Sequence, residues 1–217
     1  MSGGLSVTDW TQVGGSLVAD GSVRIQGAVN ESLARELIDA TRAPWQALPR
    51  EQGPVRQNGY ASYMSVADAA VSVRKLAADI VRELTGVAPP DVPAIPRCNE
   101  VSWTRYPAAT GRITTHRDPA PFDGIIAIAT LSGRATFSVW GGAVHGTPDE
   151  VLARGTPPTE WDASAGDLIL LRGNGWPTPD ARCPMHGVSA PADGERTIMT
   201  FRHNTRGAGG GYDVEHP

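Results

Sequence analysis

Hydrophobic and polar positions follow two different periodicities along this chain. In the first half, apolar residues recur every three or four positions, the spacing that places them on one face of a helix. This spacing predicts a helix over 31–41, capped by Asn30, and a longer helix that begins at Ser65 and ends before Gly86. In the second half, short β-branched and aromatic runs alternate with turn residues, which predicts strands.

Seven strands are predicted beyond the proline-rich stretch at 87–96. They cover 99–106, 112–115, 125–131, 134–140, 167–171, 185–189 and 196–201. Short strands separated by turns indicate a sandwich or a barrel, within a mostly β chain with flanking helices. Segment 143–165 has no clear periodicity and is either a functional lid or a surface excursion.

The remaining segments of the first half are less regular. Residues 1–15 are rich in Gly, Ser and Thr and are expected to form a loosely held arm. Segment 17–25 resembles two strand pieces around an Asp-Gly turn. The polar segment 48–64 is either a surface connection or a loop that covers an active site.

Length and composition favour one ordinary globular domain. The 217 residues are 40% hydrophobic and 19% charged, and no apolar run approaches the ~18 residues of a membrane span. No basic start precedes an apolar stretch at the beginning, so a cytoplasmic protein without a membrane partner is expected. Cys98 and Cys183 are too few for a disulfide framework. The net charge of −4 disfavours a large phosphate-binding surface, and therefore a nucleic-acid partner.

Three residues suggest a metal site. His116 and Asp118 are two apart at the end of a β-branched run, and this spacing puts them on one face of a strand. His186 lies in a later short apolar segment and supplies a third ligand. Two histidines and one carboxylate suit Fe(II) and leave coordination positions open for a cosubstrate and oxygen. The alternatives are an aspartate that caps a turn and histidines that belong to the core or the surface.

Two arginines follow on a predicted strand. Arg196 and Arg202 are six residues apart, and an even separation aims both guanidinium groups to one side of the strand. Taken in order, these features resemble the Fe(II)- and 2-oxoglutarate-dependent dioxygenases, and within them the AlkB-type branch. The residues that carry the resemblance, which spans about 98–204, are Tyr106, His116, Asp118, His186, Arg196 and Arg202; the branch's Asn-x-Tyr segment is Thr104-Arg105-Tyr106 here, without the Asn.

The resemblance implies a fold and a set of roles. It implies a double-stranded β-helix (jelly-roll) core over 98–204 in a single domain, with 1–97 as a helical lead-in and possible lid. Fe(II) would be bound by the two histidines and the aspartate. Arg196 would hold the distal carboxylate of 2-oxoglutarate, Arg202 would add a second contact on the cosubstrate side, and Tyr106 would donate its hydroxyl to the same carboxylate or simply pack as a strand aromatic.

Substrate contacts are expected from two loops. Asn174 and Trp176 precede the distal histidine and should pass near the metal, and Tyr60 and Tyr63 are candidate partners in a lid. The alternative is that these aromatic residues only anchor their loops.

Three functions agree with these features. The first is an oxygenase that hydroxylates or otherwise oxidises a small molecule, an amino-acid-like or natural-product scaffold, and releases succinate and CO2. The second is an AlkB-type nucleic-acid dealkylase, which Ala120 disfavours because the repair branch carries an acidic residue at that position. The third is a jelly-roll binding protein or a metal-dependent isomerase, which the two arginines disfavour.

Overall fold

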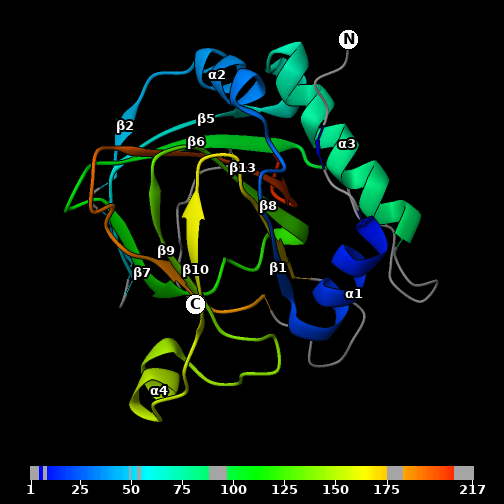
Figure 1. The fold of residues 1–217 in the computed structure, drawn as a ribbon. Helices are drawn as coiled ribbons and strands as arrows, with labels where there is room; N and C mark the ends of the chain where they lie inside the picture. Colours follow the sequence, from blue (N-terminus) through cyan, green and yellow to red (C-terminus); the bar gives the residue numbers. More distant parts are fainter. Residues whose placement is uncertain are drawn as a thin grey trace.

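Two antiparallel sheets lie face to face in the computed structural model (Figure 1), which describes residues 5–6, 9–48, 50–52, 55–87, 97–174 and 183–207. The larger sheet contains, in spatial order, β1 (Ser22–Ile25), β11 (Leu168–Arg172), β8 (Phe122–Ser132), β13 (Arg196–Asn204), β6 (Glu100–Tyr106), β5 (Tyr60–Ser65) and β2 (Gln46–Ala47). The smaller sheet contains β10 (Thr159–Ser164), β9 (Arg134–Val139), β12 (His186–Val188), β7 (Arg112–His116), β4 (Val55–Asn58) and β3 (Arg50–Gln52). This mostly β arrangement with flanking helices confirms the predicted jelly-roll.

Three helices cover the outer face of the larger sheet: α1 (Trp10–Asp20), α2 (Glu31–Asp39) and α3 (Val71–Val87) (Figure 1). Alternation along β8 explains why both faces of this sheet are apolar. Ile125 and Ala127 pack toward the helices, whereas Ile126 and Ile128 face the space between the sheets. Trp103 ties the layers together, since its indole Nε1 donates to the carbonyl of Leu37 at 2.8 Å.

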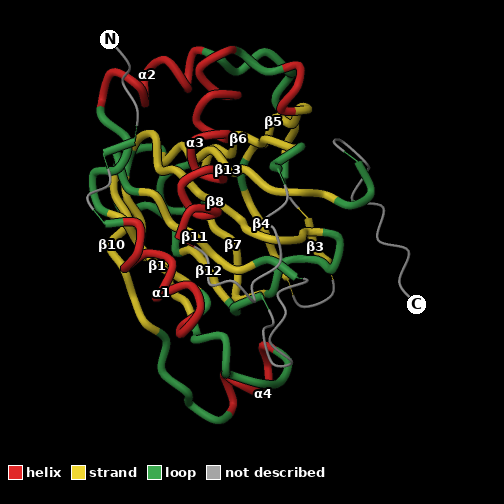
Figure 2. The backbone as a smooth tube through the Cα atoms, turned by 90° about the vertical axis from the view of Figure 1, so that its right-hand side faces the viewer, coloured by secondary structure: helices red, strands yellow, loops and turns green. Residues whose placement is uncertain are grey.

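A short helix, α4 (Pro148–Ala153), lies at the end of the molecule opposite α2, as Figure 1 and Figure 2 show from two directions. Together with β10 it lies in segment 143–165, whose sequence shows no clear periodicity but which contains regular structure at 148–153 and 159–164. Thr147 and Glu150 form a capping box, which stabilises this isolated turn of helix. Among the described residues, no helix has the length and apolarity needed to cross a membrane.

The N-terminal prediction was wrong for residues 10–20, whereas the second predicted strand piece is present as β1. Residues 10–20 form α1, capped by the Asp9 carboxylate, which accepts from the backbone N–H of Gln12. Gly14 lies in this helix where a Cβ would stand 3.1 Å from Val87 Cγ2, so glycine permits α1 to approach α3 closely. Gly21 has φ 78° and ends the helix, so the Asp-Gly pair is a helix C-cap and not a hairpin turn.

Two further predictions need correction. The segment 48–64 is not a loop, because β3, β4 and most of β5 lie in it and pair within the two sheets; the first 97 residues are therefore only partly helical. Ser65 caps a 3-10 turn (Val66–Asp68), and α3 begins only at Val71 and includes Gly86. The helix over 31–41 and the seven strands of the second half are confirmed to within a few residues, and the stretch 88–96 lies outside the described residues.

Candidate metal centre

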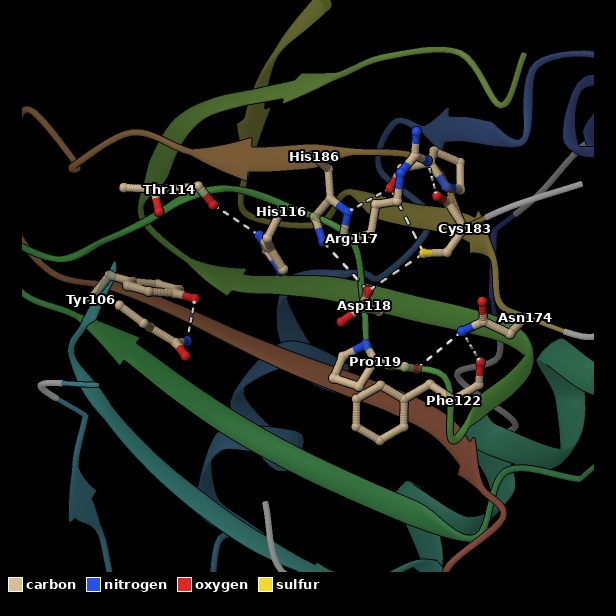
Figure 3. A network of polar contacts seen from close by, with 12 residues as sticks. Tyr106, Thr114, His116, Arg117, Asp118, Pro119, Phe122, Asn174, Cys183 and His186 are labelled. Atoms are coloured by element: carbon tan, nitrogen blue, oxygen red, sulfur yellow. Dashed lines mark hydrogen bonds and ion pairs between the residues drawn. The ribbon is translucent and has the colours of Figure 1, made fainter. Parts of the chain in front are cut away.

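The three predicted ligands come together at one end of the smaller sheet. His116 ends β7, His186 begins β12, and the two residues are direct partners in the antiparallel pairing of these strands. Asp118 follows β7 by two residues and turns back toward both rings (Figure 3). One ligand atom from each residue lies within 4.8 Å of the others, and Asp118 Oδ2 is 3.5 Å from His186 Nε2.

Both imidazoles are held in the form that a metal requires. Nδ1 of His116 is 2.9 Å from the carbonyl of Thr114, and Nδ1 of His186 is 3.1 Å from the carbonyl of Pro184. A carbonyl can only accept, so each Nδ1 carries a proton, and Nε2 is the ring nitrogen left for a metal. Burial, followed by the nearby His186, lowers the pKa of His116 to about 4, so this ring is neutral at pH 7.

The turn after Asp118 is fixed by backbone and side-chain contacts. The Asn174 amide donates to the carbonyls of Pro119 at 3.0 Å and Phe122 at 3.1 Å (Figure 3). The Cys183 thiol lies 3.9 Å from Asp118 Oδ2, within reach of a weak S–H donor. Asn174, predicted as a substrate contact, therefore lies against the metal-site turn and is not among the described residues that line the cavity.

A cavity between the two sheets opens beside the three ligands. Its described lining combines apolar side chains with hydroxyl groups and three arginines: Val55, Gln57, Tyr63, Ser102, Thr104, Tyr106, Ile113, His116, Arg117, Asp118, Pro119, Phe122, Ile126, Ile128, Phe137, His186, Val188, Arg196, Ile198, Thr200 and Arg202. Alternate residues of β13 point into it, as expected from the even spacing of its two arginines.

Arg196 is fully buried, at 0% exposure, opposite Tyr106 in the pairing of β13 with β6. One Nη group donates to the hydroxyl of Thr130 at 3.0 Å, but Nε and the other Nη have no hydrogen-bond partner in the described part of the chain. Burial lowers the pKa of Arg196 to about 10, so the guanidinium remains a cation at neutral pH. A buried cation with unsatisfied donors is costly, and the arrangement suits an arriving anion.

Tyr106 lies beside that guanidinium. Its hydroxyl accepts from Gln57 Nε2 at 3.3 Å and keeps its own proton available for donation. Burial raises the pKa of Tyr106, so the phenol stays protonated. Both side chains line the cavity.

Arg202 lies toward the other end of β13 in a different environment. Its Nε donates to Glu100 at 2.5 Å, and Glu100 also accepts from Asn204 at 3.1 Å. The guanidinium stacks 3.9 Å from the centre of the Phe122 ring, and Tyr63 is 6.0 Å away. The structure therefore brings Arg202 to the cavity already paired with a carboxylate.

The remaining predicted residues are scattered. Tyr63 lines the cavity, whereas Tyr60 is 46% exposed and is not among the described lining residues. Trp176 lies outside the described residues. Sequence reasoning missed Arg117 and Phe122. The available signal was their closeness to Asp118 in the chain, since Arg117 precedes it directly and Phe122 follows it by four residues.

Comparison with known proteins adds information about the fold. No protein-family model matches the sequence, and no curated protein does. The structure is similar to the carbocyclase SnoK from nogalamycin biosynthesis, a non-haem α-ketoglutarate-dependent enzyme, with a TM-score of 0.62, 14% identity and coverage of 97% of this chain and 90% of that chain. An oxidoreductase of the 2OG-Fe(II) oxygenase family from Burkholderia pseudomallei gives a TM-score of 0.60 and 13% identity, and 94% of each chain is covered.

A third similar structure carries ligands. HygX from Streptomyces hygroscopicus, with nickel, 2-oxoglutarate and hygromycin B bound, gives a TM-score of 0.57 and 17% identity, covering 91% of this chain and 87% of that chain. At these identities the likeness establishes a shared fold. The activity of this chain has to be argued from its own site.

The cost of burying the Arg196 guanidinium to the free energy of folding can be tested without any ligand. Replacing Arg196 with Met removes a buried cation with unsatisfied donors, so the free energy of unfolding should rise by about 1–3 kcal/mol. Urea denaturation of the two proteins measures this change. A loss of stability would mean that the guanidinium is a structural element of the core.

Proposed function

We propose that this protein is an Fe(II)- and 2-oxoglutarate-dependent oxygenase that hydroxylates or otherwise oxidises a small molecule, with release of succinate and CO2. The observation that carries the proposal is the buried Arg196, with two unsatisfied donor atoms, in the same cavity as the His116, Asp118 and His186 cluster. A metal site and an anion site that share one cavity suit a cosubstrate with a metal-chelating end and a carboxylate end.

The donor set fits iron. His116 and His186 present their Nε2 atoms and Asp118 adds a carboxylate oxygen, so the cluster matches the two-histidine, one-carboxylate set typical of non-haem Fe(II) oxygenases. When bound, Fe(II) together with 2-oxoglutarate would supply oxygen activation. The protein itself would supply three ligands, one of them the Asp118 carboxylate, and the adjoining cavity leaves room for the cosubstrate.

The two arginines would bind 2-oxoglutarate with different strengths. Arg196 can form a two-pronged, charge-assisted pair with the distal carboxylate, and the Tyr106 hydroxyl can donate to the same group. We propose that Arg202 adds a second and weaker contact, because Glu100 already neutralises much of its charge.

The substrate is proposed to be a small molecule with an amino-acid-like or natural-product scaffold. Tyr63 and the hydroxyl groups of Ser102 and Thr200 also line the cavity and are proposed to contact the substrate. The nogalamycin enzyme and the hygromycin-bound HygX support this class by analogy of fold. Tyr60 and Trp176 remain predicted contacts that the described site does not include.

A nucleic-acid dealkylase is the less favoured function. The net charge of −4 removes the general electrostatic attraction to phosphates, and Ala120 provides no acidic group after the metal aspartate. None of the similar structures named above is described as an AlkB-type protein. Both cysteines are free and buried, which supports the proposal of a location in the reducing cytoplasm. We further propose that the chain forms one domain.

Removing any one metal ligand should abolish succinate formation. His116→Ala, Asp118→Ala and His186→Ala each leave a two-ligand site, and the affinity for Fe(II) should fall by more than the roughly 10- to 100-fold typical of changes to a ligand's neighbours. The exposed His145→Ala variant is the matched control and should behave as wild type. Near-normal succinate formation in two of the three ligand variants would show that the metal site is elsewhere.

Arg196→Lys should weaken 2-oxoglutarate binding by about 1.5–3 kcal/mol and leave metal binding nearly unchanged, because an ammonium group cannot form the bidentate pair. Arg202→Lys should cost less, since Glu100 already occupies one edge of that guanidinium. Calorimetric titration of the cosubstrate into each metal-loaded variant measures both changes. Equal and negligible shifts would remove Arg196 from the cosubstrate site.

The substrate class is tested by the stimulation of succinate release. We expect stimulation by members of a panel of amino acids, short peptides and secondary metabolites, and none by methylated single-stranded oligonucleotides. The assay is repeated at low and high salt, because binding to phosphates falls steeply as salt rises. Stimulation by oligonucleotides that is lost at high salt would favour the dealkylase.

A further inference from the structure

Arg117 occupies the position between two proposed metal ligands, His116 and Asp118, and its guanidinium spans two other segments of the chain. One Nη group donates to the carbonyl of Cys183 at 2.5 Å, and the other donates to the carbonyl of Val144 at 2.5 Å (Figure 3 shows the Cys183 side). One planar cation therefore connects three stretches that are far apart in the sequence.

The first of these contacts, to the Cys183 carbonyl, affects the position of His186. Cys183 lies three residues before His186, and its carbonyl is held by Arg117 while its thiol lies 3.9 Å from Asp118 Oδ2. The segment that carries His186 is thus attached, at Cys183, to the two residues that follow His116. Such contacts set the direction from which His186 approaches the other ligands.

The second contact acts on the segment 141–158, which carries α4. This segment packs around Met185, the residue immediately before His186: Trp140, Val151 and Met185 form a buried cluster with Val144 against it. The backbone N–H of Trp140 also donates to the carbonyl of Met185 at 2.9 Å. None of the described residues that line the cavity comes from 141–158. This segment therefore supports β12, the strand that carries His186, from the side away from the cavity.

We infer that Arg117 is a positioning residue that fixes His186 for metal binding by joining the Cys183 and Val144 carbonyls to the His116–Asp118 segment. In this arrangement the segment 141–158 supports His186, and Arg117 attaches that segment to His116 and Asp118. The inference rests on the proposed function only in assuming that the His-Asp-His cluster binds a divalent metal. A lysine has the charge but cannot reach two carbonyls with one planar group, so the geometry requires arginine.

The test uses Co(II), a spectroscopic probe of ligand geometry, with the full chain and without oxygen or 2-oxoglutarate. Arg117→Gln and Arg117→Lys are compared with wild type and with Arg112→Gln, a control at the exposed start of the same strand. Titration gives the dissociation constant, and the visible absorption of bound Co(II) reports the coordination geometry. Hydrogen exchange followed by mass spectrometry reports the backbone protection of 141–158.

Both Arg117 variants should bind Co(II) about 10- to 100-fold more weakly, show a changed absorption spectrum and exchange faster across 141–158. The Arg112 control should match wild type in all three measurements. If Arg117→Gln does not fold, Arg117→Lys carries the same expectation. Wild-type affinity, spectrum and exchange in Arg117→Lys would overturn the inference, whereas failure of the wild-type protein to bind Co(II) would contradict the proposed function itself.

Discussion

The pairing of β7 with β12 is the constraint on which the rest of the site depends. It places His116 directly opposite His186, with ring centroids 4.3 Å apart, although 69 residues lie between them in the sequence. The rings are turned by their Nδ1 contacts to carbonyls, and Phe137 stacks parallel to His186 at 5.6 Å. The backbone pairing brings both imidazoles together, whereas Asp118 reaches them through a turn, and Asn174 holds that turn.

The larger sheet supplies the opposite wall, and its two arginines differ in how their charge is compensated. Arg202 is paired with a buried carboxylate, Glu100, and stacks on Phe122. Arg196 is buried against neutral hydroxyl groups and has unsatisfied donors among the described residues. A buried cation of this kind is expensive for the folded protein, and this cost supports the proposal that Arg196 binds a carboxylate of 2-oxoglutarate.

The sequence predicted the strands of the second half and the His116–Asp118 pair because both depend on local rules, whereas His186 was chosen as a third ligand from far downstream, in the order that the family resemblance implies. Alternation identifies a strand, and a two-residue spacing identifies two ligands on one face. It failed where a residue's role depends on distant partners. Gly14 lies in a helix that packs closely against Val87, and the strands within 46–65 form because the sheets offer them edges to pair with. Likewise, Asn174 and Arg117 act through backbone carbonyls that no sequence pattern places beside them.

We propose that one cavity binds Fe(II) through His116, Asp118 and His186 and 2-oxoglutarate through Arg196. Visible absorption after anaerobic addition of Fe(II) and 2-oxoglutarate tests this binding most directly, because a metal-to-ligand charge-transfer band requires the 2-oxo acid to chelate the iron. We expect a band in the wild-type protein that is lost in His186→Ala and that needs much higher 2-oxoglutarate in Arg196→Lys. No band in the wild-type protein, or a band that is unchanged in both variants, would contradict it.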